Sequence, residues 1–183
     1  MEWMKGLSQR VFEVLDLARG PHEGIHSVHD CLVARTKRHA IVDPYIRRWH
    51  STLPNPPPGF RAAFVVVGEI KHTVLAVATW GRPVARMEDY KATLELTRLA
   101  HGPNPPRNLG TWALSRMRHW IRENMPEISR LISYQDADVH DGALYKADNW
   151  TKLYEKFTEH TWTNRPGRLG TERIHKIKWE RSP

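Results

Sequence analysis

Residues 93–124 read TLELTRLAHGPNPPRNLGTWALSRMRHWIREN, and this stretch decides the fold. Apolar, Leu-rich positions over Thr93–Ala100 predict a strand, and a loop rich in glycine and proline, His101–Gly110, follows it. Apolar residues then recur at helical spacing, which predicts a long helix over Thr111–Asn124. A strand, a glycine-containing loop and a helix in that order can hold a phosphate at the start of the helix.

After this stretch the sequence alternates between strand and helix patterns. Ile128–Tyr134 predicts a strand, and Gly142–Phe157 predicts a helix. Two further strands are expected at His160–Trp162 and Arg173–Trp179, joined by the turn residues Asn164–Arg168.

The N-terminal side adds a hairpin and two helices. Phe60–Val67 and Thr73–Trp80 are β-rich runs separated by Gly68–His72, which predicts a hairpin. Asp43 before Pro44 predicts an N-cap and a short helix, Pro44–His50. The spacing of apolar residues predicts an amphipathic helix over residues 4–19.

Together these elements predict the α/β class. We expect a central mixed, mostly antiparallel sheet flanked by helices. At 183 residues the protein fits a single domain, 1–183, with residues 1–22 as an N-terminal helical appendage.

Charge and aromatic content point to nucleic acid. The sequence has 28 Lys and Arg against 20 Asp and Glu, a net charge of +8, and it contains eight tryptophans. Positive charge with flat aromatic surface favours a nucleic-acid partner. The alternative is a solvated basic face with the tryptophans in the core.

Other classes of protein are not expected. The longest apolar run, Ala62–Val67, is too short to cross a membrane, so no membrane partner is predicted. Residues 1–17 lack a secretory signal, and the only cysteine, Cys31, cannot form an internal disulfide. We therefore expect a cytoplasmic protein.

One cluster invites a metal interpretation. His22, His26, His29 and Cys31 fall within ten positions of the sequence. Zinc sites usually draw paired ligands from two separated segments, and the sequence has no second pair of that kind. No metal site is predicted.

Residues 133–150 resemble a known protein family. Ala143–Trp150, ALYKADNW, resembles the late helix of the GNAT acyltransferase superfamily, with a tyrosine followed closely by a lysine. Together with the preceding Ser133–Asp136, the positions His140, Gly142 and Tyr145 resemble the Mom-like branch, whose members modify adenine in phage DNA. Weaker similarities extend over about residues 40–180, among them Trp49–His50 and the TWGRP and TNRPGR segments.

The resemblance implies an acyl donor, acetyl-CoA or a related compound. The GNAT pyrophosphate loop corresponds to Arg107–Trp112, which keeps the arginine and the first glycine but has Trp112 where a small residue is usual. Free N–H groups at the start of the helix still favour a phosphate. The alternative is an ordinary strand-to-helix turn. The expected donor-binding residues are Leu99, Arg107, Asn108, Gly110 and Thr111.

The resemblance also implies the catalytic roles. Asp136 is expected to orient the acceptor amine or to accept its proton, and Tyr145 is expected to act as the general acid. His140 or His50 could share the role of base. The structural alternatives are a helix cap for Asp136, a turn residue for His140 and a packing residue for Tyr145.

Double-stranded DNA is the expected partner. Trp49 or Trp80 could stack on a base that has left the helix. Glu95, Arg98 and Tyr134 are assigned to the substrate side by resemblance. The arginines could instead make surface ion pairs. The expected phosphate contacts are Arg47, Arg48, Arg82, Arg86, Arg165 and Arg168.

The residues and the family resemblance favour three functions. The first is a phage-encoded enzyme, active in the host cytoplasm, that adds an acyl or carbamoyl-type group to adenine N6 and protects DNA from restriction. The second is a GNAT N-acetyltransferase acting on a protein, a small amine or aminoacyl-tRNA. The third is an inactive module that binds nucleic acid, which the unusual Trp112 favours.

Overall fold

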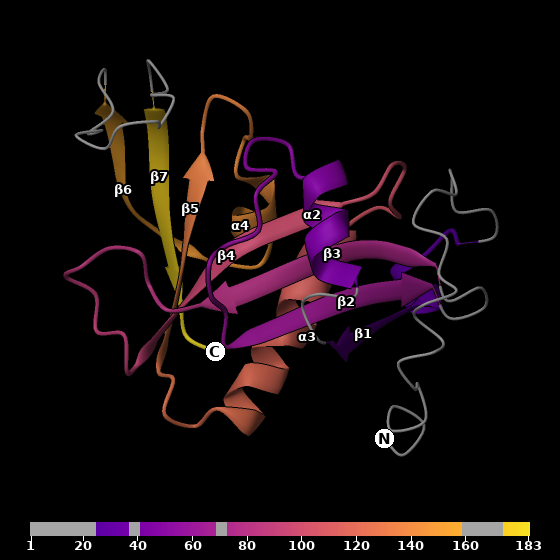
Figure 1. Ribbon diagram of the computed structural model, residues 1–183, viewed down its shortest axis with the longest axis horizontal. Coiled ribbons are helices and arrows are strands. Elements are labelled where there is room, and N and C mark those ends of the chain that lie inside the picture. The colour runs from indigo at the N-terminus through magenta and orange to yellow at the C-terminus, as the bar shows by residue number, and fades with distance from the viewer. Residues whose placement is uncertain (1–24, 37–40, 69–72, 159–173) are drawn as a thin grey trace.

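The computed structural model describes residues 25–36, 41–68, 73–158 and 174–183. Within these ranges one seven-stranded sheet has the order β1-β2-β3-β4-β5-β7-β6 (Figure 1). Neighbouring strands are antiparallel except for β4 and β5, which are parallel. The predicted mixed, mostly antiparallel sheet is therefore confirmed. The strands are β1 (Cys31–Arg35), β2 (Ala62–Gly68), β3 (Val74–Gly81), β4 (Thr93–His101), β5 (Arg130–Asp136), β6 (Thr151–Thr158) and β7 (Ile174–Arg181).

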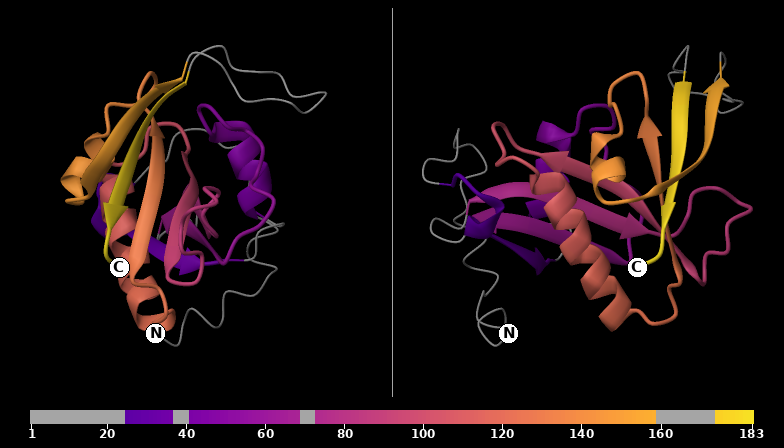
Figure 2. Two further views of the ribbon diagram at one scale, coloured as in Figure 1. Left: turned by 90° about the vertical axis from the view of Figure 1, so that its left-hand side faces the viewer. Right: turned by 180° about the vertical axis from the view of Figure 1, so that it is seen from behind.

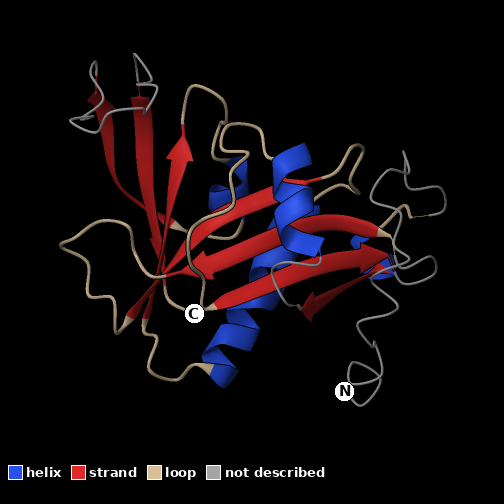
Figure 3. Cartoon of the chain, in the orientation of Figure 1, coloured by secondary structure: helices blue, strands red, loops and turns tan. Residues whose placement is uncertain are grey.

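Helices cover both faces of the sheet. Helix α2 (Asp43–Trp49) lies on one face, while α3 (Leu109–Asn124) and the short α4 (Ala143–Ala147) lie on the other (Figures 2 and 3). A 3-10 turn, η2 (Val28–Asp30), precedes β1. Two apolar cores result, one under α2 and one under α3.

The hairpin β2–β3 forms the centre of both cores. Every residue of the two strands is buried, because the helices cover both of their faces. This explains why AAFVVVG is continuously apolar rather than alternating. On the α2 side, the hydroxyl of Tyr45 donates a hydrogen bond to the carbonyl of Val74 at 3.2 Å.

The predicted helix Gly142–Phe157 is wrong in its second half. Helix α4 ends at Ala147, and Asn149 adopts a left-handed conformation with φ 55°. Residues 151–158 form β6 instead, paired with β7 at the edge of the sheet. Leu153 and Phe157 are four residues apart, which suited a helix, but the strand pairing decides the local structure.

The other described elements form where they were predicted, with their ends shifted by a few residues. Strand β1 was not predicted, and Asp43 is the first residue of α2 rather than its cap, because Val42 occupies the N-cap position. The predicted helix 4–19 and strand 160–162 lie outside the described residues, as does His22. No helix in the described part of the protein has the length and apolar character needed to span a membrane.

Candidate functional site

The two parallel strands β4 and β5 separate part-way along their length. Four residue pairs join the two strands, the first between Thr93 and Arg130 and the last between Leu96 and Ser133. Beyond the last pair β4 and β5 run apart (Figure 1). We call this point the fork. The fork is the place where backbone groups at the centre of the sheet are no longer paired between these two strands.

A β-bulge accompanies the fork. Thr79 pairs with Arg98 while Trp80 pairs with Leu96, so Thr97 is an extra residue in β4. Its hydroxyl donates to the carbonyl of Thr79 at 2.9 Å, which fixes the bulge. Bulges bend a strand and end regular pairing, so this local geometry explains why β4 leaves β5 here.

Tyr145 places a hydroxyl group at the fork. Its oxygen lies 2.8 Å from the Ser133 hydroxyl, which in turn donates to the carbonyl of Leu96 at 3.4 Å. The ring stacks on Trp179 with a centroid distance of 5.3 Å. Burial raises the pKa of Tyr145, so the phenol keeps its proton at neutral pH and can act as a donor.

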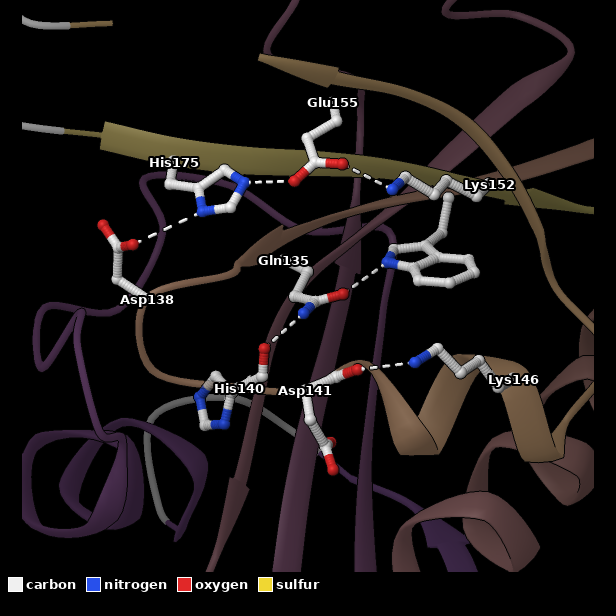
Figure 4. Close-up of polar contacts among 9 residues, drawn as sticks. Gln135, Asp138, His140, Asp141, Lys146, Lys152, Glu155 and His175 are labelled. Carbon is white, nitrogen blue, oxygen red and sulfur yellow. Dashed lines mark hydrogen bonds and ion pairs between the residues drawn. The ribbon is translucent and has the colours of Figure 1, made fainter. Parts of the chain in front are cut away.

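The loop between β5 and α4 is held by polar contacts of Gln135 and His175, which Figure 4 shows. Gln135 accepts from the Trp179 indole at 2.7 Å and donates to the carbonyl of His140. His175 lies between Asp138 and Glu155, with its Nδ1 3.3 Å from the Asp138 carboxylate.

Gly142 lets this loop turn into α4. Its φ is 73°, and a Cβ there would lie 2.6 Å from the Gln135 side-chain oxygen. Only glycine suits both the left-handed backbone and the close approach. The backbone of this segment therefore sets the position of Tyr145 three residues later.

Three histidines gather beside the fork. The ring of His140 lies 2.9 Å from the Ser51 hydroxyl, next to His50 at the end of α2. Burial, and then the charges of Arg98, His140 and His101, lower the pKa of His50 to about 4. His50 is therefore neutral at pH 7.

The tautomer of His50 follows from its contacts. Its Nδ1 accepts hydrogen bonds from the backbone N–H groups of Thr52 at 3.3 Å and Leu53 at 3.1 Å. A neutral imidazole whose Nδ1 accepts must carry its proton on Nε2. His50 thus offers an N–H donor rather than a free base.

His101, the last residue of β4, packs beside the start of α3. Its buried Nε2 has no hydrogen-bond partner among the described residues, and burial lowers the pKa of the ring. The backbone of Gly110 packs against it, because a Cβ on Gly110 would lie 3.0 Å from that nitrogen. An orphaned imidazole nitrogen beside the first turn of a 16-residue helix suits a ligand with hydrogen-bonding oxygens.

Comparison with known proteins decides the family. The model of the Mom protein family matches residues 62–182, which include the fork, α3 and α4. The chain belongs to the Mom protein family. A comparison with curated proteins finds no match.

Solved structures show the fold of this Mom-family chain. The Escherichia coli ribosomal-protein-S18-alanine N-acetyltransferase has a TM-score of 0.58 at 13% identity, covering 83% of this chain and 93% of its own. An N-acetyltransferase from Staphylococcus aureus Mu50 has a TM-score of 0.58 at 12% sequence identity, and the match covers 83% of this chain and 98% of that enzyme. A GNAT phosphinothricin acetyltransferase from Sinorhizobium meliloti, in complex with acetyl-CoA, has a TM-score of 0.58 at 12% sequence identity. The match covers 84% of this chain and 88% of that enzyme. The predicted GNAT-like fold is confirmed.

The Mom-family chain brings some predicted catalytic residues together. Tyr145 reaches the fork, and His140 contacts Ser51, the residue that follows His50. Asp136 ends β5, and its carboxylate accepts from the backbone N–H of Asp138 at 3.2 Å. It therefore shapes the turn that carries His140.

The predicted donor-binding residues surround the start of α3. Leu99 packs against the α3-side core, and Arg107 is exposed. Asn108, with φ 64°, is the N-cap residue of α3, and Gly110 and Thr111 lie in the first turn of the helix. Trp112 is half-buried, with the Arg116 guanidinium 5.7 Å from its ring.

The prediction that Trp80 stacks on a base is wrong. Trp80 is fully buried and stacks on Trp150 inside the α3-side core. Its neighbours Gly81 and Arg82 suggested an exposed turn, but its partner in β4, Leu96, faces the core. Trp49 is half-buried against the α2-side core, with Arg48 4.9 Å from its ring.

The remaining substrate-side residues differ in exposure. Glu95 is buried and accepts from the backbone N–H of Val84 at 2.8 Å, and burial raises its pKa. Arg98 donates to the carbonyl of Asn55, and burial raises the pKa of the half-buried Tyr134. Arg47, Arg48, Arg82 and Arg86 are exposed, whereas Arg165 and Arg168 lie outside the described residues.

Ser133, Gln135, His101 and Ser51 were not predicted to have roles. Ser133 and Gln135 lie in the segment that carried the family resemblance, so their alternate spacing on one strand face could have indicated them. His101 and Ser51 come from distant segments, and only the fold places them beside His140. Within the described ranges, His, Cys, Asp and Glu side chains form no group that could hold a metal.

Proposed function

We propose that this protein transfers a small acyl or carbamoyl-type group to the N6 amine of adenine in double-stranded DNA. Membership in the Mom family supports the acceptor, since the Mom-like proteins that this chain resembles modify adenine in phage DNA. The observation that carries the proposal is the protonated Tyr145 hydroxyl at the fork, held by Ser133.

The reaction needs a proton donor and a proton acceptor. The N6 nitrogen forms a bond to the donor's carbonyl carbon, and the bond from that carbon to the leaving atom breaks. The amine loses one proton and the leaving group gains one. Tyr145 holds a proton at its phenolic oxygen and is suited to the acid role.

Asp136 and His140 are the candidates to accept the amine proton. They sit on one turn, because the N–H of His140 donates to the carbonyl of Asp136 at 3.0 Å. His50 is suited to a different role, because its Nε2–H can donate to a developing negative charge. The adenine amine is a weak nucleophile, so orientation by these groups matters.

An acyl-CoA donor would supply a thioester carbonyl. The start of α3 and His101 would hold it, since N–H groups of a first helical turn and an orphaned imidazole nitrogen both suit phosphate or carbonyl oxygens. One GNAT acetyltransferase of similar fold is described as a complex with acetyl-CoA.

The mass of nucleosides from DNA of cells that express the protein tests the proposal. We expect a modified adenosine with the wild type, and on the order of 100-fold less with Tyr145→Phe, because the general acid is lost. Tyr45→Phe is the matched control. It removes another buried tyrosine hydroxyl, on the α2 side of the sheet, and should leave the yield unchanged.

Other outcomes would replace the proposal. Equal yields from wild type and Tyr145→Phe would remove Tyr145 from the mechanism. If DNA carries no new nucleoside while the purified protein acetylates a free amine with acetyl-CoA, the second candidate, a GNAT N-acetyltransferase, takes its place. The similar fold of three acetyltransferases favours that alternative.

A further inference from the structure

Two lysines face each other on neighbouring strands near the fork. Lys156 of β6 and Lys176 of β7 are direct partners in the antiparallel register, so both project from the same face of the sheet. Both side chains are exposed. Neither ammonium group forms an ion pair with a carboxylate within the ranges that the structure describes.

Like charges placed directly opposite each other destabilise a sheet. The protein avoids this cost at neighbouring positions. Lys152 pairs with Glu155 (Figure 4), Lys178 pairs with Glu88, and Arg130 pairs with Glu88 and Glu180. Lys156 and Lys176 make no such ion pair among the described residues, and although Asp136 lies opposite Lys176 on its other side, an anionic ligand between the two ammonium groups would relieve their repulsion.

The register connects this pair to the candidate site. Lys176 is also the direct partner of Asp136 on β5, so Asp136, Lys176 and Lys156 form one row across three strands. The charge of Lys176 also acts on Glu95 of β4, on the other side of the fork.

An aromatic row adjoins these lysines. Tyr134, Lys178 and Tyr154 are partners in the next row on the same face. Tyr154 is 46% exposed, so part of its ring is accessible. Cations next to an accessible aromatic ring are typical of surfaces that follow a nucleic-acid strand.

We propose that Lys156 and Lys176 together bind a phosphodiester group of the DNA strand that carries the acceptor adenine. This inference rests on the proposed function and adds a contact that positions the DNA. The row leads directly from the phosphate to Asp136, so binding there would bring the adjoining nucleotide to the fork.

Binding of the full-length protein to a labelled duplex oligonucleotide, measured at several salt concentrations, tests this inference. We expect Lys156→Gln and Lys176→Gln each to lower the salt-dependence slope by about one, and to weaken binding on the order of fivefold at low salt. Because a repulsion is removed, the melting temperature should stay the same or rise by about 1–2 °C.

Lys152→Gln is the matched control. Lys152 is an exposed lysine on the same strand, but it is paired with Glu155 and lies opposite Trp179, on the face toward α4. Its substitution should leave both the slope and the affinity close to the wild-type values. A structural role for the Lys156–Lys176 pair would instead lower the melting temperature and leave the slope unchanged.

The outcomes separate this inference from the proposed function. If the wild type modifies DNA and both lysine variants keep the wild-type slope, the phosphate contact is wrong and the proposed function stands. If the lysine variants lose affinity for tRNA but not for duplex DNA, the inference is also overturned. If the wild type neither binds duplex DNA nor modifies it, both proposals fail.

Discussion

At the scale of the single residue, His50 shows how the fold sets a proton state. Its pKa is about 4 in the folded protein, against 6.5 for an ordinary histidine. Between pH 4 and pH 6.5, His50 therefore binds a proton more readily in the unfolded protein than in the folded protein. The stabilising contribution is complete above pH 6.5 and is lost as the pH falls toward 4.

We expect His50 to account for about 1 kcal/mol of lost unfolding free energy between pH 7 and pH 5, after allowance for the partial exposure of the ring. His50→Asn keeps an acceptor for the backbone N–H groups but removes the titration, so its pH dependence should be flatter by that amount. Urea unfolding at the two pH values measures it. The exposed His119, changed to Asn, is the control, and an H50N variant that follows the wild-type curve would contradict the assignment.

The family resemblance indicated candidate residues where one short segment of sequence carries them. Tyr145 and His140 follow β5 within one short segment, and both reach the site. His101 depends on how the start of α3 packs against β4, which no local pattern reveals. The prediction for Trp80 was also wrong because it depended on packing: the exposure of a side chain near a strand end is set by the helix that covers that end, and Trp80 is buried in the α3-side core.

At the scale of elements, a buried ion pair joins α4 to α3. Arg118 donates two hydrogen bonds of 2.8 Å to Asp148, and the Trp150 indole donates to the same carboxylate. The side chains of Arg118 and Asp148 are only 11% and 6% exposed. This contact holds the helix that carries Tyr145.

Asp148→Ala should lower the unfolding free energy by about 3 kcal/mol, because it leaves the Arg118 charge buried without a partner. The control is Glu127→Ala, which breaks the more exposed pair with Arg61 and should cost less than about 1 kcal/mol. Chemical denaturation of both variants gives the comparison. Similar losses in the two variants would show that the buried pair has no special role.

Elements were predictable where one pattern dominates. The hairpin, α2 and α3 each have a clear period or a flanking proline, and all three form as expected. Residues 151–158 contain features of both helix and strand, so the outcome depends on β7, which lies far along the sequence. Strand β1 is short, and residues 36–61 separate it from its partner β2, so it has no local hairpin signature.

At the scale of the whole molecule, one continuous sheet lies between the two cores. β2 and β3 contribute side chains to both the α2-side and the α3-side core. Because both cores pack on the same strands, unfolding of the sheet would disrupt both cores at once. The single-domain prediction for 1–183 therefore implies one cooperative unfolding transition.

Far-ultraviolet circular dichroism and tryptophan fluorescence should give coincident urea transitions. The fluorescence reports mainly the α3-side core, where Trp80, Trp150 and Trp179 are buried, whereas circular dichroism reports the whole protein. Two separated midpoints would show that the cores unfold independently and would contradict the single-domain prediction.

The bulge at Thr97 changes the parity of β4. Side chains in a strand alternate between faces with a period of two, and one extra residue reverses which positions point to which side. Glu95 and Arg98 thereby share the α2 side, while Leu96, Leu99 and His101 share the α3 side. If Thr97 were instead paired in the regular register, without a bulge, the second half of β4 would turn over, with a guanidinium in the apolar layer and the imidazole away from α3. A β4 strand one residue shorter, lacking Thr97, would keep the other side chains on their present faces and would lose only the bulge at the fork.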